Sequence, residues 1–342
     1  MSSLSDTTAP IRLGTRRSAL ARAQSGQVAA ALEKASGRRV ELVPIVSEGD
    51  TNRASLSEIG GMGVFATRLR EALRRGECDL LVHSLKDLPT AQPDDLVIAA
   101  TPARADARDV AVTRDGAPLH ELRTGSTIGT GSPRRIAQVR IRAPRSRAVD
   151  IRGNVDSRLG RVASGELDAV ILAAAGLSRL DGDPLDGLHA EALGLAEWPT
   201  APGQGALAVE TTADAPEELR AALARLDDEG TRIAVTAERA TLAGLDAGCQ
   251  APMAVHAAME GRNLRVRAVV YAPSDERRIG VDVTEPLSRG YIRRNGSGDG
   301  ANAADGADPI GAARDIGSDV ARRLLEQGAA GLLPETRPDD HD

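Results

Sequence analysis

The sequence predicts an α/β protein with two doubly wound domains and a smaller α+β domain toward the C-terminal end. Three observations lead to this fold class. Short aliphatic runs bounded by turn residues alternate with helix-like segments, which is the pattern of a parallel sheet covered by helices. The chain has 342 residues, which suggests two or three cores rather than one. Beyond about residue 231 the pattern changes to a helix followed by closely spaced strands.

The first α/β unit is expected to end near residue 104. Its strands are predicted at residues 11–13, 40–46 and 80–82. Two helices are predicted between these strands, because apolar residues there recur on one helical face. The first face contains Leu20, Val28, Ala31 and Leu32, and the second contains Phe65, Leu69, Ala72 and Leu73.

A second α/β unit is expected from Asp109 onward, and it repeats a feature of the first. Its strands are predicted at residues 109–112, 127–129, 148–151 and 169–173. In the first unit a strand ends in GTRRS before a helix, and in the second a strand ends in GTGSPRR before a helix. Ser132 followed by Pro133 is a favourable helix start. Ligands bind at the carboxyl ends of strands in open α/β sheets, and free helix N–H groups there favour anions.

A third, α+β domain is expected at the C-terminal end. It comprises a helix at 231–242, a loop through Cys249, antiparallel strands at 255–258, 264–271 and 279–283, and a final helix. The Gly/Asn/Asp-rich stretch 289–308 is predicted to be a flexible insertion.

Two Pro/Gly-rich connections, at about 100–108 and 199–205, lie before and after the second unit, as expected if the chain crosses between the two α/β units at these places. A hinged, two-lobed cleft is the expected result. The predicted boundaries are 10–104 with 202–228 for domain 1, 105–201 for domain 2 and 229–342 for domain 3.

Composition excludes several classes of function. A net charge of −6 gives no basic footprint for nucleic acid. Two cysteines are too few for a disulfide framework, and the five histidines show no zinc-site spacing, so neither a disulfide nor a structural metal is expected. No stretch approaches the roughly 20 apolar residues of a membrane span, and the opening MSSLSDTTAP lacks an apolar signal core. We therefore expect a cytoplasmic protein.

Arginine dominates the basic residues, since only Lys34 and Lys86 among the 43 are lysines. A compositional bias explains much of this. Several arginines nevertheless follow predicted strand ends, where guanidinium forks match carboxylates bidentately, so a cluster there would suit a polycarboxylate. These arginines are Arg16, Arg17, Arg134, Arg135, Arg152, Arg158 and Arg179.

The segment HSLKDLP directly follows the predicted strand 80–82. It places the amine of Lys86 beside the carboxylate of Asp87 at the carboxyl end of a strand. Two interpretations are open, a solvated ion pair in a turn and a catalytic pair, and the position at the expected cleft strengthens the catalytic one.

Two further segments have both a functional and a structural interpretation. The polar stretch 47–59 followed by Gly60–Gly63 predicts a mobile lid or, alternatively, an ordinary long loop. Phe65, the only phenylalanine, either covers a flat ligand at the edge of that segment or packs in the core. Cys249 lies in a small-residue loop from which its thiol can project, although a free cysteine is more often a small buried hydrophobe, as we expect for Cys78.

Together and in this order, these segments resemble the porphobilinogen deaminase (hydroxymethylbilane synthase) family over about residues 11–282. The resemblance rests on GTRRSALA, GGMGVF, HSLKDLPT, GTGSPRR, DIRGNVDSRL, ILAAAGLSRL, PGQGALAVE and AERATLAGLDAGCQAP. It implies two domains like those of periplasmic binding proteins and a third that carries a dipyrromethane cofactor. The cofactor is joined by a thioether to a loop cysteine, which matches Cys249.

The resemblance also implies an activity, that of a transferase of porphyrin, tetrapyrrole and heme biosynthesis. Such an enzyme deaminates four molecules of porphobilinogen, joins them head to tail on the dipyrromethane primer, and releases hydroxymethylbilane and ammonia. Asp87 matches the catalytic aspartate, which stabilises the cation left by ammonia and shuttles protons. Family members are expected to be monomers.

The binding residues follow from the same match. Positions that contact the cofactor are Ser84, Lys86, Asp87, Thr130, Ser132, Arg134 and Arg135. Positions that contact the substrate are Arg16, Ser18, Phe65, Arg152, Arg158, Arg179 and Gln204. The arginines among them hold the acetate and propionate groups of the pyrroles.

Two features depart from the family pattern. Met62 stands where many members carry a lysine, so a role for a lysine there does not transfer, and the 289–308 stretch has no obvious equivalent. A two-lobed carboxylate-binding protein without catalysis is the alternative function. The third domain and the polar N-terminal segment argue against it.

Overall fold

The computed structural model describes residues 9–45, 63–246, 251–287 and 308–334. The predicted lid, the Cys249 loop and the 289–308 insertion therefore lie outside the described residues, apart from Gly63 and Asp308. The chain divides into two compact units, whose ranges are Met1–Ala105, Ser178–Asp183 and Gly205–Asp228 for the first and Asp106–Leu177, Pro184–Gln204 and Glu229–Asp342 for the second. Within the described part of the chain, no helix is long and apolar enough to cross a membrane.

The first unit contains a five-stranded sheet in the order β2-β1-β3-β10-β4. The strands are β1 (Ile11–Thr15), β2 (Val40–Pro44), β3 (Leu80–Ser84), β4 (Leu96–Ala100) and β10 (Leu207–Thr212). β10 runs antiparallel to both of its neighbours, while β1, β2 and β3 are mutually parallel. The three strands predicted for this unit are confirmed, whereas β4 and β10 were not predicted.

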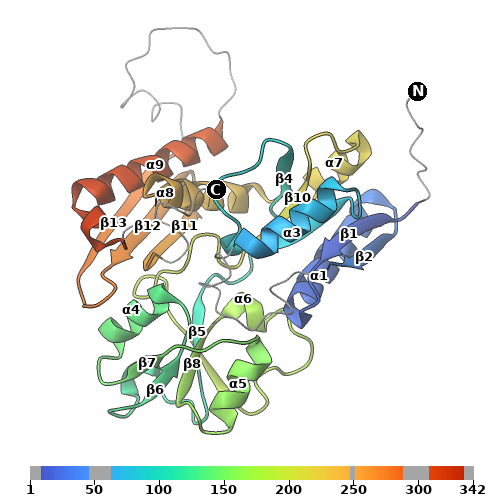
Figure 1. Ribbon diagram of the computed structural model, residues 1–342. Coiled ribbons are helices and arrows are strands. Elements are labelled where there is room, and N and C mark those ends of the chain that lie inside the picture. The colour runs from blue at the N-terminus through green and yellow to red at the C-terminus, as the bar shows by residue number, and fades with distance from the viewer. Residues whose placement is uncertain (1–8, 46–62, 247–250, 288–307, 335–342) are drawn as a thin grey trace, which may run out of the picture. The chain divides into compact units, whose positions relative to one another are not determined.

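Helices cover both faces of this sheet (Figure 1). α1 (Ala19–Ser36) and α7 (Glu217–Ala224) pack on one face, and α3 (Gly63–Arg74) packs on the other. The alternation of side chains along a strand sets this division. Leu80 belongs to the core under α1, and its neighbour Leu81 belongs to the core under α3.

The second unit contains a sheet of the same design, in the order β7-β6-β8-β5-β9. Its strands are β5 (Asp109–Thr113), β6 (Thr127–Gly129), β7 (Arg147–Val149), β8 (Ala169–Ala173) and β9 (His189–Ala192). β5 runs antiparallel to β8 and β9, as β10 does to its neighbours in the first unit. The predicted repetition between the two α/β units is thereby confirmed.

Two glycines occupy corresponding places in these sheets, Gly14 in β1 and Gly129 in β6. A Cβ added at Gly14 would lie 2.7 Å from a methyl of Leu81, and one added at Gly129 would lie 2.7 Å from a methyl of Leu167. Both distances are shorter than van der Waals contact, so glycine at each position allows the neighbouring leucine side chain to pack closely against the strand.

Helices of the second unit also lie on opposite faces of its sheet. α4 (Pro133–Arg142) packs beside Trp198 and Ile128, whereas α5 (Val155–Ala163) packs on the face that contains Val170. A short helix, α6 (Ala174–Leu177), directly follows β8.

The C-terminal part of the second unit is the predicted α+β structure. An antiparallel sheet, β11 (Met253–Glu260), β12 (Asn263–Tyr271) and β13 (Arg278–Pro286), is covered on one face by α8 (Glu229–Gly244) and α9 (Pro309–Glu326) (Figure 1). Its core is aliphatic, as the scarcity of aromatic residues predicts.

One detail of the first predicted helix is wrong. Ala31 is exposed, and the buried face of α1 contains Gln24, Ser25 and Ala29 in addition to Val28 and Leu32. Polar side chains are tolerated on this face because they bond to other buried groups; Ser25 donates to Thr15 at 2.8 Å.

Candidate active site

The predicted catalytic residues lie where β3 ends. A single 3-10 turn, η1 (Leu85–Asp87), follows the strand and is anchored by the buried side chain of Leu85. The amide of Leu85 donates to Ala206 O at 3.0 Å, which ties the turn to the start of β10. Lys86 is half-buried and Asp87 is exposed. The carboxylate of Asp87 is therefore held at the carboxyl end of a central strand while remaining accessible to a ligand.

Ser84, the last residue of β3, is oriented by a glutamine that the sequence analysis did not single out. The Nε2 atom of Gln24 donates to Ser84 Oγ at 3.0 Å. Gln24 is only 6% exposed and lies on the inner face of α1. This contact fixes the rotamer of Ser84 beside the η1 turn.

The arginine-containing loop between β1 and α1 has the predicted form. Ser18 is the N-cap of α1 and its hydroxyl accepts from the amide of Ala21 at 3.3 Å. Arg16 is half-buried, and Arg17 is exposed. Ser18 thus has a structural partner of its own, and contact of Ser18 and Arg16 with substrate stays a prediction.

In the second unit, Arg134 and Arg135 converge on one buried carboxylate, that of Asp109. Arg134 Nη1 lies 2.8 Å from Asp109 Oδ2, and Arg135 Nη2 lies 2.6 Å from Oδ1. Arg134 also bonds to Gln138 Oε1 at 2.7 Å, and Arg135 to the carbonyl of Ile171 at 2.9 Å. The two arginines stand at the start of α4 as predicted, but they are buried against a partner rather than open at a strand end.

The charges of this cluster do not cancel. Burial alone would raise the pKa of Asp109, but the nearby charges of Arg134 and Arg135 outweigh it and hold that pKa well below its ordinary value. Asp109 is therefore ionised, and two guanidinium groups face one carboxylate. The Nε atoms of both arginines are buried and have no hydrogen-bond partner among the described residues. The cluster therefore has a surplus of positive charge, which an anionic group would balance.

Two more side chains complete the shell of Asp109. Trp198, the only tryptophan, donates from Nε1 to Oδ2 at 2.9 Å, and Gln204 donates from Nε2 to Oδ1 at 2.8 Å. Gln204 is 1% exposed and also donates to Ala107 O at 2.8 Å. The predicted substrate residue Gln204 thus supports Asp109, and its contact with substrate stays a prediction.

Thr130 and Ser132 lie directly ahead of these arginines. Thr130 is fully buried, and its Oγ1 accepts from the amide of Ser132 at 3.3 Å. Ser132 occupies the N-cap position with Pro133 next, as predicted, but its hydroxyl makes no capping hydrogen bond. That hydroxyl is thus not committed to the end of α4.

Further arginines gather near the start of α5. The N-cap is Asn154, and its side chain accepts from Ser157 N at 2.9 Å. Arg158 Nε donates to Gly153 O at 2.9 Å. Burial lowers the pKa of Arg158, and the charges of Arg135 and Arg152 lower it further. Mutual repulsion among these guanidiniums indicates a shared positive field suited to an anion.

Arg152 and Arg179 differ in exposure. Arg152 is exposed and lies 3.4 Å from the carboxylate of Asp150. Arg179 is buried, and its Nη2 donates to the carbonyl of Gly205 at 2.8 Å. Burial lowers the pKa of Arg179.

Comparison with known proteins identifies the family. Residues 11–220 match the family model described as porphobilinogen deaminase, dipyromethane cofactor binding domain, and residues 232–290 match porphobilinogen deaminase, C-terminal domain. This chain belongs to the porphobilinogen deaminase family. The match spans both α/β sheets and the antiparallel sheet, so it favours the enzyme over a two-lobed binding protein.

Relatives match over almost their full length. The porphobilinogen deaminase of Leifsonia xyli subsp. xyli is 50% identical over 328 residues, which cover 95% of this chain and 94% of the relative. Porphobilinogen deaminase 1 of Streptomyces coelicolor is 48% identical over 336 residues, with 95% and 98% covered. Among solved structures, the VFT2 domain of Bordetella pertussis BvgS is 18% identical, and the match covers 64% of this chain and 86% of the BvgS chain. Its TM-score of 0.38 is too low to support a structural comparison.

Two predicted site residues lie wholly or partly outside the described part of the chain. Cys249 lies outside the described residues, and for Phe65 only the backbone, in the first turn of α3, is described. Cys78 is buried as predicted, at 2% exposure. Among the described His, Cys, Asp and Glu residues, no group of three is arranged to hold a metal ion.

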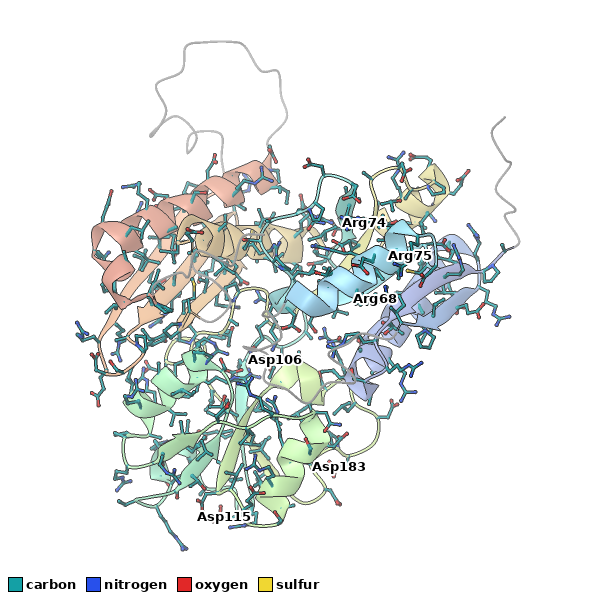
Figure 2. All side chains as sticks on the ribbon, in the orientation of Figure 1. Arg68, Arg74, Arg75, Asp106, Asp115 and Asp183 are labelled. Carbon is teal, nitrogen blue, oxygen red and sulfur yellow. The ribbon has the colours of Figure 1, made fainter. Side chains whose placement is uncertain are left out.

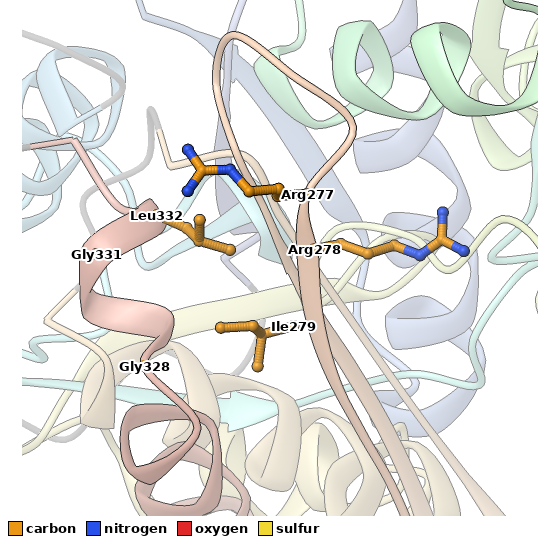
Figure 3. A pocket seen from close by; sticks show the side chains of 6 residues that line it. All are labelled: Arg277, Arg278, Ile279, Gly328, Gly331 and Leu332. Atoms are coloured by element: carbon orange, nitrogen blue, oxygen red, sulfur yellow. The ribbon is translucent and has the colours of Figure 1, made fainter.

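A surface hollow of about 350 Å³ lies elsewhere, between the start of β13 and the 3-10 turn η3 (Ala329–Leu332). Figure 3 shows Arg277 and Arg278 beside it, with their side chains extending in opposite directions. Arg277 is paired with Asp275 at 2.9 Å. The two guanidiniums do not form a joint anion clamp, and we assign no ligand to this hollow.

Proposed function

We propose that this chain deaminates porphobilinogen and joins four molecules head to tail, releasing hydroxymethylbilane and ammonia. Membership of the porphobilinogen deaminase family along almost the whole chain supports this reaction. The geometric observation that carries it is the buried Asp109 cluster, whose surplus positive charge suits the acetate and propionate groups of pyrroles.

The residues present fit a dipyrromethane cofactor. Its carboxylates would balance the surplus charge of Arg134 and Arg135, and the uncommitted hydroxyl of Ser132 can donate to the same groups. We assign Thr130, Ser84 and Lys86 to the same group of contacts and Cys249 to its attachment by a thioether. When bound, the cofactor supplies a pyrrole carbon as the nucleophile that primes chain growth.

Asp87 is assigned to the chemical step. Loss of ammonia from porphobilinogen leaves a positive charge spread over the pyrrole, and an ionised carboxylate near the ring nitrogen stabilises that charge. The same carboxylate can accept and return a proton. The anchored η1 turn holds this group in place before the charge develops, so little reorganisation is needed.

Substrate carboxylates are assigned to the remaining arginines. A substrate with an acetate and a propionate on each ring needs several cations, and guanidinium forks remain charged through the reaction. The lowered pKa of Arg158 shows that its ionised form is penalised by burial and by its cationic neighbours, and an anion would relieve this penalty. The assigned residues are Arg16, Arg152, Arg158 and Arg179, with Ser18, Gln204 and Phe65 as further contacts.

We propose the three-domain division given above, a monomeric enzyme that binds no nucleic acid, and a cytoplasmic location. Light scattering of the purified protein tests whether it is a monomer.

The experiment that tests the function combines intact mass with product analysis. We expect purified protein to exceed the chain mass by two linked pyrroles and to convert porphobilinogen into a linear tetrapyrrole with four ammonia released per product. A carboxylate-binding protein would bind porphobilinogen without the mass excess and without ammonia. Absence of both would overturn the proposal.

A further inference from the structure

The carboxylate of Glu210, in β10, is fully enclosed in the first unit and is bound by polar side chains from other parts of the chain. Its side chain is 0% exposed. Gln92 Nε2 donates to Glu210 Oε1 at 2.7 Å, and His83 Nε2 lies 3.1 Å from Oε2. None of these three residues belongs to the predicted cofactor or substrate contacts.

The two partners are the two ends of one chain segment. His83 begins and Gln92 ends the stretch that contains Ser84, Lys86 and Asp87. The carboxylate of Glu210 therefore contacts both ends of the segment that contains the proposed catalytic aspartate. Within the segment, Leu88 N donates to Leu85 O at 3.1 Å, so the enclosed turn has its own local hydrogen bond.

Arg70 supplies the charge that keeps this carboxylate in place. Its Nη2 lies 2.8 Å and its Nε 3.1 Å from Glu210 Oε1, and its own side chain is 8% exposed. Three other arginines lie in or directly after α3, namely Arg68, Arg74 and Arg75, which Figure 2 labels. All three are exposed. Since only Arg70 turns inward, α3 is linked to the same carboxylate as the two segment ends.

An intact buried ion pair stabilises a fold little more than well-packed apolar residues of similar volume would, because desolvation offsets most of the attraction, although removing one partner alone is destabilising. An apolar cluster already covers this face of the sheet. The polar network therefore contributes more to geometry than to the strength of the fold. Because side chains alternate along β3, His83 faces α3 and Glu210, while Ser84 faces α1 and Gln24.

We propose that Glu210 is a positioning residue of this enzyme: its carboxylate clasps both ends of the 83–92 segment and thereby fixes the turn that presents Asp87. This inference rests on the proposed function, in which Asp87 stabilises the developing cation. A displacement of the Asp87 carboxylate by about 1 Å is enough to lower the rate on the order of 10²-fold.

The decisive variant is Glu210→Gln, which keeps the size of the side chain and removes its charge. We expect kcat per folded, cofactor-loaded molecule to fall by about 10-fold or more with KM changed less than about 2-fold, because binding arginines are untouched. Amide hydrogen exchange should quicken within residues 83–92. Glu217→Gln, at an exposed pair with Arg220, is the matched control and should alter neither measurement.

A second variant releases only one end of the segment. Gln92 is half-buried, and Gln92→Leu leaves the buried Arg70–Glu210 pair intact, so this variant is expected to fold. It should lower kcat less than Glu210→Gln does and quicken exchange near residue 92. If Glu210→Gln does not fold, Gln92→Leu alone decides the question by the same two readouts.

The outcomes separate this inference from the proposed function. Normal kcat per loaded molecule and unchanged exchange at 83–92 in the folded variants would overturn the clasp, provided that Asp87→Asn is impaired. Normal turnover by Asp87→Asn as well would instead remove Asp87 from the reaction and overturn the assignment on which the clasp rests.

Discussion

Arg134 and Asp109 form an ion pair at 2.8 Å in which neither side chain is more than 3% exposed. Arg135 binds the other oxygen of the same carboxylate. Asp109 is thus the residue that orients both arginines proposed to hold the cofactor, and it leaves one positive charge for a ligand to balance.

Asp109→Asn is expected to be severely destabilising. It removes the charge that two buried guanidiniums share, and loss of one partner of a buried ion pair costs about 3–5 kcal/mol. Urea unfolding at neutral pH measures this loss. Asp106→Asn makes the same change at an exposed pair with Arg108 and should cost less than about 1 kcal/mol. Equal effects of the two substitutions would show that the buried cluster has no special role.

Arg134→Ala and Arg135→Ala should impair cofactor assembly or retention. Each removes a cation from the cluster, which leaves a cofactor carboxylate without its partner. Much of the purified protein should then lack the mass excess of two pyrroles. Arg142→Ala, on the same helix but paired with Glu197 at the surface, should retain the full excess. Fully loaded Arg134→Ala and Arg135→Ala proteins would contradict this part of the account.

Acid should remove the stabilisation that Glu210 provides. Burial raises the pKa of Glu210, but hydrogen bonds from His83 and Arg70 outweigh burial and lower the pKa from 4.5 to about 2. A lowered folded-state pKa gives stability that is complete above the unfolded-state value and is lost as the pH falls through the folded-state value. The stability difference between the natural protein and Glu210→Gln should therefore shrink between pH 4.5 and about 2. Urea unfolding over this range measures it, and a difference independent of pH would count against the ion pair.

The two cysteines should differ in reactivity. Burial, reinforced by the charge of Asp79, raises the pKa of Cys78 to about 11, so at pH 8 only about one thiol in a thousand is ionised. A thiol reagent should find no fast-reacting group in cofactor-loaded protein and one, Cys249, in cofactor-free protein. Cys249→Ser should abolish the fast group and the mass excess together. A fast thiol in loaded protein that disappears in Cys78→Ala would show that the cysteines are assigned wrongly.

The sequence was sufficient to predict most elements because periodicity and turn residues are local signals. Ser18 and Ser132 both stand at the helix starts that their strand–loop–helix patterns predict. The fold class and the repetition between the two α/β units follow from these local patterns. Family motifs then supplied the cofactor, which no periodicity could have indicated.

The partners of the site residues could not be predicted, because they depend on pairing between distant segments. Asp109 is 25 residues from Arg134, and Glu210 is 140 residues from Arg70. Asp109 looked like the start of an apolar strand, and Glu210 lies in a strand that was not predicted. A charged residue within an otherwise apolar run was the available signal, since such a residue must have a partner if the strand is buried.

The central claim, that Asp87 stabilises charge in the reaction rather than binding ligand, is tested most directly by single-turnover kinetics of Asp87→Asn. Intact mass first establishes that the variant carries the cofactor, and equilibrium binding of porphobilinogen establishes that the site is formed. We predict a loaded, binding-competent protein whose turnover is lower by on the order of 10²-fold or more, the effect of one preorganised electrostatic group. Near-normal turnover by the loaded variant would contradict the account and assign the proton and the charge to another residue.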